Sequence, residues 1–403
     1  MSDERKAGRG ARPEVNRRVI LGAGLAAGTM VRRAAPVLAA VDQSKPPLAE
    51  LARRRGIRYG TAAMASQLLA GDSFTELLTR EAALLVPENE MKWSHMSAAP
   101  FHADYRIPDS IVDFAAAHGL LLRGHNLLWF WRTPQWFTEL RGRAAARAAM
   151  VQRVADMVGR YRGRIDSWDV VNEPVNPADN RPDHLRIAVF LQQIGPEYLE
   201  LAHVTARDAD PAARLVLNEY GVEYDTPDAD RKRAAVLDVL ATMRKRGIPV
   251  DALGVQAHLS VGRYPFAAKK LRDYLAAAAA MGLEIQITEL DCTDERAPAD
   301  IAARDRMVAD EYRRFLDVAL DEPAVTQVNS WGLSDRYSWI VRHEDSADRQ
   351  RHDGMAERPL PFDRDLRRKP AWHALAEAFA RAPRRDSGPR QRVVAATSAS
   401  SRD

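Results

Sequence analysis

The chain has 403 residues but only one cysteine, Cys292, so no intrachain disulfide can form. A large domain does not need such bonds, because its hydrophobic core supplies the stability that small secreted scaffolds take from disulfides. Hydrophobic residues make up 46% of the chain and charged residues 28%, as in ordinary globular proteins. We interpret Cys292 as a small buried hydrophobic residue and not as a nucleophile, since the sequence offers no recognisable partner base.

Signatures of several other protein classes are also missing. No apolar run is long enough to span a bilayer, and no repeat of solenoid period occurs. The ten histidines form no His-Glu-x-x-His motif, so we expect neither a metal nor another cofactor. The net charge is +4, but no stripe of Lys and Arg with interleaved aromatic residues indicates nucleic-acid binding. We therefore expect a soluble catalytic body with basic ends.

The two ends of the chain differ in composition from the rest. Arg17 and Arg18 precede a modest apolar run, and the small residues Ala39 and Ala40 follow. This pattern indicates a twin-arginine export signal over residues 1–40, with a disordered Arg-rich leader as the alternative. The mature protein would then be periplasmic or secreted, without a membrane anchor. Residues 382–403, rich in Arg, Pro, Ser and Ala, are predicted to form a disordered basic tail.

Between these ends, short apolar runs alternate with helical stretches, which predicts a single (β/α)8 TIM-barrel catalytic domain over residues 45–381. The alternative, an open doubly wound sheet, is disfavoured because no glycine-rich phosphate turn follows the first strand. The predicted strands are Arg58–Ala62, Ala83–Val86, Leu120–His125, Ile165–Val171, Leu215–Asn218, Ala252–Ala257, Glu284–Thr288 and Val325–Ser330. The clearest predicted helices are Ser110–His118, Ala144–Tyr161, Pro196–Ala209, Asp228–Arg246, Ala267–Met281, Pro298–Leu320 and a final helix that includes Leu375–Phe379.

The residues that follow the predicted strands are mostly polar or aromatic. Active sites of such barrels lie at the strand C-termini. There the sequence supplies carboxylates and amides, which hydrogen-bond hydroxyl groups, and indoles, which pack against the C–H face of a sugar. One Glu or one Trp in such a position is usually structural, but the pattern occurs on seven strands. The sequence therefore predicts a carbohydrate site.

Two glutamates, Glu173 and Glu289, each follow an apolar strand-like run. Paired carboxylates are the equipment that most glycosidases use to break a glycosidic bond. One of them must hold a proton while the other stays ionised, which requires different surroundings for the two.

The motifs around these positions resemble the family 10 glycoside hydrolases, which are mainly endo-1,4-β-xylanases. The resemblance runs from about Leu48 to Phe379 and follows the family's order of motifs. These motifs are Glu88–Trp93, Arg123–His125, Trp168–Pro174, Gly254–Leu259, Ile287–Asp291 and Trp331–Trp339.

The resemblance implies hydrolysis of β-1,4-xylosidic bonds in xylan or xylo-oligosaccharides by double displacement, with retention and without a cofactor, and we expect a monomer. Glu173 would be the general acid/base and Glu289 the nucleophile. Asn172 would bind the sugar 2-hydroxyl, and His258 and Asp291 would orient Glu289. The implied substrate-binding residues are Glu88, Asn89, Lys92 and His125 on the glycone side, Gln256 near the cleavage point, and the walls Trp129, Trp331 and Trp339.

The third loop departs from the family pattern, since Phe130 replaces a histidine and Arg132 replaces a glutamine. After the fifth strand, Asn218-Glu219-Tyr220-Gly221 replaces the usual Asn-Asp-Tyr-Asn. One hypothesis is that Arg132 binds an acidic branch such as a glucuronyl group through a bidentate pair. The alternative is that Arg132 is solvated or pairs with a nearby glutamate.

Two other functions remain open on the sequence. The chain could be a barrel glycosidase that acts on another β-1,4-glycan or on short oligosaccharides. It could also be a carbohydrate-binding protein without catalysis, but the presence of both carboxylates, Asn172 and His258 counts against this.

Overall fold

The computed structural model describes residues 45–100, 102–342 and 351–385. The chain divides into two units, Met1–Val37 and Leu38–Asp403, and all described residues belong to the second. The predicted export signal over residues 1–40 therefore lies outside the described residues, as do residues 386–403 of the predicted tail. Both assignments stay predictions.

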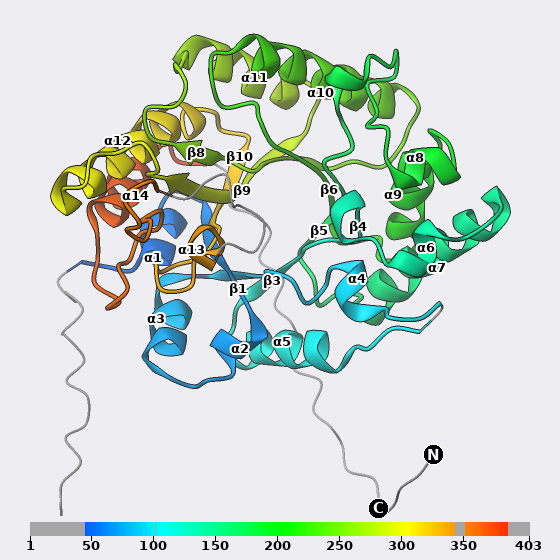
Figure 1. Cartoon of the computed structure of the whole chain (residues 1–403), viewed down its shortest axis with the longest axis horizontal. Helices are drawn as coiled ribbons and strands as arrows, with labels where there is room; N and C mark the ends of the chain where they lie inside the picture. Colours follow the sequence, from blue (N-terminus) through cyan, green and yellow to red (C-terminus); the bar gives the residue numbers. More distant parts are fainter. Residues whose placement is uncertain (1–44, 101, 343–350, 386–403) are drawn as a thin grey trace, which may run out of the picture. The chain divides into compact units, whose positions relative to one another are not determined.

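The second unit is a closed eight-stranded parallel barrel surrounded by helices, so the predicted TIM barrel is confirmed (Figure 1). The sheet order is β10-β1-β2-β3-β5-β6-β7-β9, and pairing between β9 and β10 closes the ring. These barrel strands are β1 (Arg58–Ala63), β2 (Leu84–Pro87), β3 (Leu121–Gly124), β5 (Ser167–Asn172), β6 (Arg214–Glu219), β7 (Ala252–Val255), β9 (Glu284–Thr293) and β10 (Val325–Ser330).

Two of the predicted strands are interrupted near the rim of the barrel. The short strand β4 (Leu128–Trp129) follows β3 and pairs with β5, and β8 (His258–Ser260) follows β7 and pairs with β9. Strand β9 is longer than predicted, so Glu289 lies inside it and not at its end. Its pairing changes from β7, up to Ile287, to β8, from Asp291 onward. Glu289 therefore lies where β9 passes from one partner strand to the next.

The helices cover the outside of the barrel, and the seven predicted ones are present. They are α5 (Arg106–Ala117), α7 (Arg143–Arg160), α9 (Tyr198–Ala209), α10 (Pro227–Lys245), α11 (Ala268–Ala280), α12 (Ile301–Ala319) and α14 (Pro370–Arg381). The sequence analysis did not predict α1 (Leu48–Arg53), α2 (Ala65–Leu68), α3 (Ser73–Glu81), α4 (Trp93–Met96), α6 (Gln135–Thr138), α8 (Val189–Gln193) and α13 (Trp339–Arg342). Gly247 and Gly282 follow α10 and α11 with left-handed φ values of 69° and 76°, as expected for glycines that end helices.

The inside of the barrel is more polar than the predicted apolar runs suggested. Arg58 lies 2.6 Å from Asp166 near the strand N-termini, and the buried Arg123 forms an ion pair with Asp169 higher in the barrel. Buried charges of this kind require partners, and these are supplied from neighbouring strands. Polar side chains therefore extend from the inside of the barrel to the carboxylates and amides at its rim.

The first and last helices of the barrel meet beside β1. The carboxylate of Glu81, in α3, accepts hydrogen bonds from the amide of Leu48 at 3.0 Å and from the indole of Trp372 at 3.1 Å. Beyond α14, Arg385 is also buried, and its side chain donates to the carbonyls of Val325 and Leu320. The chain therefore packs against the barrel four residues past 381, where the sequence placed the start of the tail.

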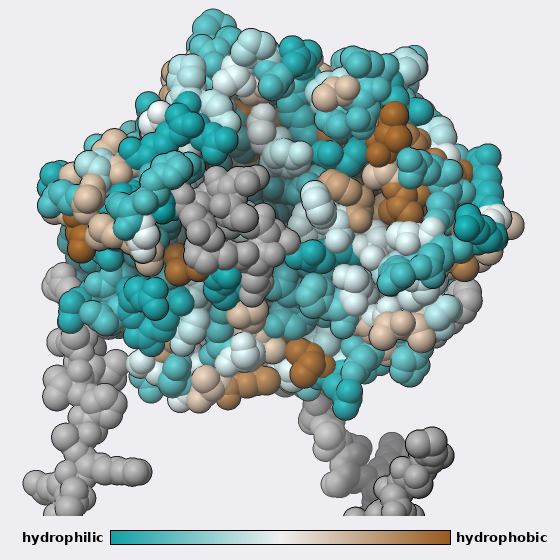
Figure 2. All heavy atoms as spheres, viewed as in Figure 1, coloured by the Kyte–Doolittle hydropathy of each residue, from teal (hydrophilic) through white to brown (hydrophobic). Residues whose placement is uncertain are grey.

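The face of the molecule seen in Figure 2 is largely hydrophilic, with scattered hydrophobic residues. Among the described helices, none combines the length and apolar character needed to cross a membrane.

Candidate active site

Glu173 follows β5 directly and is 8% exposed. Its amide donates to the carbonyl of Asn218 at 2.9 Å, and its φ of 58° lies in the left-handed region. Such a backbone is unusual for a residue with a side chain, and strained residues of this kind cluster at functional sites. The carboxylate accepts hydrogen bonds from Asn172 at 3.2 Å and from Gln256 at 3.1 Å.

The surroundings of Glu173 favour its protonated form. Burial raises the pKa of Glu173 above its ordinary value, and repulsion from Glu289 adds to this rise, whereas the hydrogen bond from Gln256 opposes it. A carboxyl group with a raised pKa can hold a proton at a pH where ordinary glutamates are ionised. Glu173 is therefore suited to the role of a general acid.

Glu289 is also buried, with 5% of its surface exposed, but its surroundings favour the ionised form. One oxygen accepts a hydrogen bond from Asn218 at 2.7 Å, and the other lies 3.2 Å from Nε2 of His258. Burial alone would raise the pKa of Glu289, but the hydrogen bond and charge of His258, the nearby His125 and the amide of Asn218 lower it to about 2. Glu289 is thus an ionised carboxylate over the working range of most enzymes.

His258 connects Glu289 to a second carboxylate. Its Nδ1 lies 2.8 Å from Asp291, which also accepts a hydrogen bond from the indole of Trp339 at 2.7 Å. Burial alone would lower the pKa of His258, but Asp291 and Glu289 raise it to about 10. His258 is therefore an imidazolium that donates to both carboxylates, with Trp339 and Asp291 fixing its orientation.

The two glutamates are joined by a path of side-chain amides across neighbouring strands. Asn218, at the end of β6, donates to Asn172 on one side and to Glu289 on the other, at 2.7 Å each. Its own oxygen accepts from Thr288 at 2.7 Å, which fixes the orientation of the amide. Strands β5, β6 and β9 thus carry Glu173, Asn172, Asn218 and Glu289 into one hydrogen-bonded cluster, although β7 lies between β6 and β9.

The predicted glycone-side residues form a second cluster at the ends of β2 and β3. Lys92 donates to Asn89 at 2.9 Å, and its ammonium lies 5.0 Å from the Trp129 ring and 5.9 Å from the Trp331 ring. His125 lies 2.9 Å from Asp169 and packs edge-on against Trp331 at 4.9 Å between ring centroids. A cation between two indoles beside an imidazole offers both stacking surfaces and hydrogen-bond donors to a sugar.

Comparison with known proteins places this site in a family. The family described as glycosyl hydrolase family 10 matches residues 47–378. The chain belongs to glycosyl hydrolase family 10. It is therefore a family 10 glycosidase, as the sequence motifs predicted.

Curated and solved relatives agree with this assignment. Endo-1,4-β-xylanase A of Phanerodontia chrysosporium is 31% identical over 341 residues, which are 83% of this chain and 78% of that protein. Endo-1,4-β-xylanase B of Thermotoga neapolitana is 30% identical over 337 residues, which are 82% of this chain and 91% of that protein. The structure of xylanase 10B from Thermotoga petrophila in complex with xylobiose has a TM-score of 0.74 and 28% identity, covering 83% of this chain and 97% of that one.

The remaining predicted residues of this family 10 site also lie at the rim. Glu88 forms an ion pair with Arg342 of α13, which the sequence analysis did not anticipate. The guanidinium of Arg132 lies 5.9 Å from the Trp129 ring, and neither hypothesis for Arg132 is tested by this contact. In the described part of the chain, no three His, Cys, Asp or Glu side chains form a group that could hold a metal ion.

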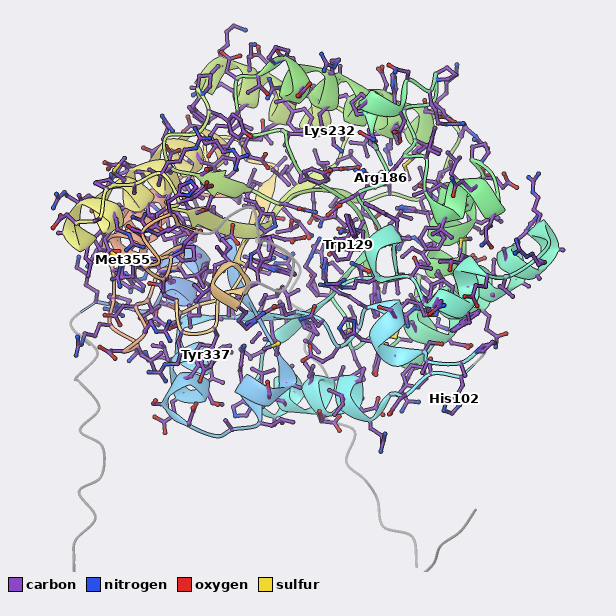
Figure 3. All side chains as sticks on the ribbon, viewed as in Figure 1. His102, Trp129, Arg186, Lys232, Tyr337 and Met355 are labelled. Carbon is purple, nitrogen blue, oxygen red and sulfur yellow. The ribbon has the colours of Figure 1, made fainter. Side chains whose placement is uncertain are left out.

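Several residues that support the site were missed from the sequence. Arg186 donates to the carbonyl of Glu173 at 2.9 Å and to the hydroxyl of Tyr220 at 3.1 Å, and it lies 4.6 Å from the Phe130 ring. The ammonium of Lys232 lies 2.6 Å from the carboxylate of the buried Glu219. Figure 3 shows that Trp129, Arg186 and Lys232 come from separate parts of the chain. Arg186 and Lys232 come from a loop and a helix, where no strand-end pattern points to them. Asn218 did end a predicted strand, and that position was the available signal.

Proposed function

We propose that this chain is a retaining endo-1,4-β-xylanase in which Glu289 is the nucleophile and Glu173 the general acid/base. The observation that carries the proposal is the opposite shift of two neighbouring carboxylates. The pKa of Glu173 is raised, and that of Glu289 is lowered to about 2. One protonated and one ionised carboxyl group in the same site is the pair that acid-assisted cleavage of a glycosidic bond requires, and the resemblance to the family 10 glycoside hydrolases implies that this pair works with retention.

In the first step, a carboxylate oxygen of Glu289 attacks the anomeric carbon while Glu173 gives its proton to the leaving glycosidic oxygen. The C–O bond to the leaving sugar breaks, and an ester forms between Glu289 and the remaining sugar. Positive charge develops on the sugar ring in the transition state. Asn172, which contacts Glu173 at 3.2 Å, would strengthen its hydrogen bond to the 2-hydroxyl as that charge grows.

In the second step, water enters on the side of Glu173. Esterified Glu289 carries no charge, so its repulsion on Glu173 disappears and the pKa of Glu173 falls. Glu173, now ionised, takes a proton from the water, whose oxygen attacks the anomeric carbon. The ester breaks, Glu289 regains its negative charge, and two inversions give net retention.

Xylan as substrate is supported by the names of the relatives and by the shape of the aromatic walls. Trp129, Trp331 and Trp339 stand beside Lys92, His125 and His258, and indoles so close to the site leave little space for a hydroxymethyl group on the sugar ring. One additional carbon is worth only ~1–3 kcal/mol of discrimination. Weak hydrolysis of β-1,4-glucosides is therefore compatible with the proposal.

The test is release of reducing ends from xylan and from a cellulose-derived glucan, with proton NMR of the anomer formed first. Faster hydrolysis of xylan with initial release of the β-anomer is expected. An initial α-anomer would contradict the retaining mechanism, and preference for the glucan would contradict the substrate. Glu173→Ala and Glu289→Ala serve as inactive references. On an aryl xyloside, whose leaving group departs without a general acid, azide should rescue both variants and give glycosyl azides of opposite anomeric configuration, since it replaces the nucleophile in one variant and the incoming water in the other.

Recognition of an acidic branch by Arg132 is a finer proposal with its own test. Hydrolysis of glucuronoxylan is compared with hydrolysis of a neutral arabinoxylan for the wild type and Arg132→Gln. If the guanidinium pairs with a uronyl carboxylate, the variant loses activity on glucuronoxylan selectively, because a charged hydrogen bond is lost only there. An unchanged ratio of the two rates would contradict this role.

A further inference from the structure

Glu223 is a buried carboxylate that the mechanism above does not use. It lies in the loop after β6, is 4% exposed, and accepts a hydrogen bond from the amide of Ala257 at 3.1 Å. Burial raises the pKa of Glu223, against the nearby amides of the loop and the positive charge of His258. Burying a carboxyl group costs free energy unless it is hydrogen-bonded, so Glu223 depends on the backbone amides that donate to it.

The partner of Glu223, Ala257, has an unusual backbone. Its φ is 61°, in the left-handed region, where a Cβ atom is disfavoured by roughly 1–2 kcal/mol. Such a conformation persists only when the surrounding structure holds it in place. The hydrogen bond from the Ala257 amide to Glu223 is one contact that does so.

The turn at Ala257 carries the contacts of both catalytic glutamates. Strand β7 ends at Val255 and β8 begins at His258, so Gln256 and Ala257 alone form the turn between them. The Gln256 side chain donates to Glu173, its carbonyl accepts from the amide of Glu289 at 2.9 Å, and His258 holds the Glu289 carboxylate. A shift of this turn would move the partners of Glu173 and Glu289 together.

The next residue of the same loop holds the far end of β8. The hydroxyl of Tyr224 accepts a hydrogen bond from the amide of Ser260 at 2.7 Å and lies 3.2 Å from the Ser260 carbonyl, to which it donates. Tyr224 is 7% exposed, so these bonds are shielded from water. Glu223 therefore holds Ala257, and Tyr224 holds Ser260. These two residues lie on either side of His258 and Leu259.

We propose that Glu223 and Tyr224 are positioning residues that hold the turn at Ala257 and β8, and thereby the side chains of Gln256 and His258, against the two catalytic glutamates. The inference rests on the proposed roles of Glu173 and Glu289, but not on which sugar the enzyme cleaves. Other charged groups that face His258 and Glu289 are Asp291, His125 and Glu173, and none of them contacts Ala257 through a side-chain bond among the described residues.

The test measures kcat/KM against pH for Glu223→Ala and Glu223→Gln on a substrate that the wild type cleaves. A misplacement of about 1 Å can reduce rates by about 10²-fold, so Glu223→Ala is expected to lose activity on that scale. Its acid limb should also move to higher pH, because a displaced His258 no longer keeps Glu289 ionised. Glu223→Gln retains an acceptor oxygen and should stay close to the wild type. Ala257→Gly, which favours the left-handed backbone, should restore part of the activity of Glu223→Ala.

Asp210→Ala is the matched control. Asp210 is a buried carboxylate that also accepts backbone amides, from Gly163 at 2.8 Å and Ala212 at 3.0 Å, in a loop before β6 at the other end of the barrel. Its loss should lower stability without moving the acid limb. A limb that stays in place in Glu223→Ala would overturn the inference.

If Glu223→Ala does not fold, Tyr224→Phe gives the decision, because it removes a single hydroxyl and must move the acid limb in the same direction. An unmoved limb in that variant overturns the inference. A wild type that is inactive on every β-1,4-glycan would instead overturn the proposed function. These two failures are therefore distinguishable.

Discussion

At Glu289, burial and hydrogen bonding act on the same carboxylate in opposite directions. Burial raises its pKa, but His258 at 3.2 Å and Asn218 at 2.7 Å outweigh burial and bring the pKa down to about 2. Glu173 is buried to a similar degree, but the hydrogen bonds from Gln256 and Trp129 and the charge of Arg186 do not outweigh its burial and the repulsion from Glu289, so its pKa stays raised. The opposite pKa shifts of the two glutamates thus come from their neighbours.

His258→Gln tests this balance. A glutamine can still donate a hydrogen bond but carries no charge, so the pKa of Glu289 is expected to rise from about 2 toward its ordinary value of 4.5 or above. Because Glu289, the proposed nucleophile, must be ionised to react, the acid limb of kcat/KM is expected to move to higher pH, and the loss of activity should be greater at pH 4 than at pH 7. His118→Gln, at the end of α5, is the control. Equal losses at both pH values would contradict the charge role of His258.

The positions of Glu173, Glu289 and His258 at the rim of the barrel were predictable at this scale, but the hydrogen bonds that couple them were not. The motifs around Glu173, Glu289 and His258 are specific and lie close to strand ends. The bridging role of Asn218 depends on distances between β5, β6 and β9 that no sequence pattern contains. The left-handed backbone of Ala257 was equally hidden, because alanine gives no sign of a positive φ.

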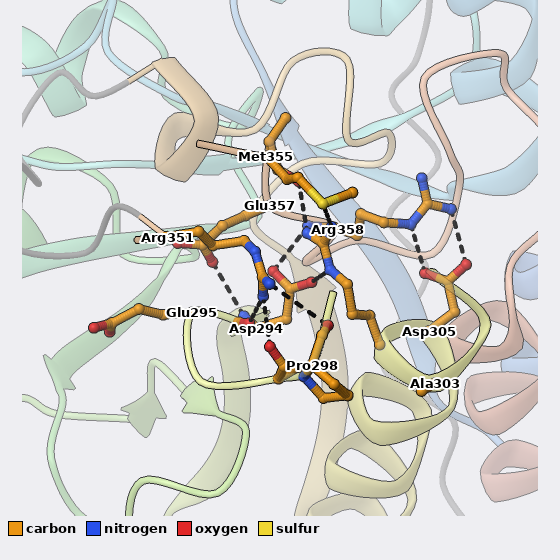
Figure 4. A network of polar contacts seen from close by, with 12 residues as sticks. Asp294, Glu295, Pro298, Ala303, Asp305, Arg351, Met355, Glu357 and Arg358 are labelled. Atoms are coloured by element: carbon orange, nitrogen blue, oxygen red, sulfur yellow. Dashed lines mark hydrogen bonds and ion pairs between the residues drawn. The ribbon is translucent and has the colours of Figure 1, made fainter. Parts of the chain in front are cut away.

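At the scale of elements, β9 connects the active site to the segment that precedes α14. After Glu289 and Asp291, the strand reaches Thr293, whose hydroxyl donates to Glu357 at 2.5 Å. Asp294 follows and forms a buried ion pair with Arg304 of α12 at 2.5 Å (Figure 4). Strand β9 is thus held at its C-terminal end by charges from other parts of the chain.

Glu357 makes the stability of this network depend on pH. Burial raises the pKa of Glu357 to about 7, above the ordinary value of 4.5. Between these values the folded protein retains a proton that the unfolded chain has released. Ionisation of Glu357 therefore lowers the free energy of unfolding. This destabilisation reaches its full size above about pH 7 and is absent below pH 4.5.

Glu357→Gln should accordingly raise the free energy of unfolding, by about 1–3 kcal/mol at pH 8, and leave it nearly unchanged at pH 4. Urea denaturation at both pH values measures the difference. Glu377→Gln on α14, an exposed site, is the control and should show little change at either pH. A variant that is less stable than the wild type at pH 8 would contradict this interpretation.

Glu81→Ala tests how α3 fastens the first and last helices. The buried carboxylate accepts hydrogen bonds from Leu48, Arg80, Arg368 and Trp372. Removing one partner of a buried ion pair costs about 3–5 kcal/mol, because the remaining charge stays buried. We expect a loss of that size in urea denaturation with kcat/KM at 25 °C unchanged, whereas the exposed Glu76→Ala on the same helix changes neither. A loss no larger than that of Glu76→Ala would contradict the fastening role.

The elements themselves followed the sequence closely where their patterns were long. The helices α7, α10 and α12 begin and end within a few residues of the predicted positions, because each has many apolar residues at helical spacing. Short helices such as α4 and α6 were missed, since four residues carry too little periodicity. The breaks before β4 and β8 depend on pairing with β5 and β9, which is a tertiary contact.

At the scale of the whole molecule, the first and last strands of the barrel pair with each other, and the chain that follows α14 packs against the start of β10. The side chain of Arg385 donates to carbonyls of Leu320, Glu322 and Val325, just before and at the start of β10. The backbone amide of Arg385 donates to the carbonyl of Arg55 at 3.0 Å. Residues near the two ends of the described chain are therefore tied to each other.

Two truncations test this boundary. A chain that ends at Arg385 is expected to unfold at the temperature of the full chain. A chain that ends at Arg381 loses the guanidinium bonds, each worth about 1.5–3 kcal/mol, and should unfold several degrees lower. Arg385→Ala in the full chain should reproduce most of that loss. If the two truncated chains and Arg385→Ala all melt at the same temperature, residues 382–385 add no stability and the domain ends at residue 381.

The imidazolium of His258 stands between the carboxylates of Glu289 and Asp291, so these three groups together carry a net negative charge. A ligand that places a protonated nitrogen where the substrate has its anomeric carbon would meet this negative charge directly, as the developing cation does in the transition state. Sugar-shaped amines should accordingly be better inhibitors than neutral sugars of the same shape. Their advantage should shrink in Glu289→Gln, which removes the negative charge but leaves the place of the sugar open.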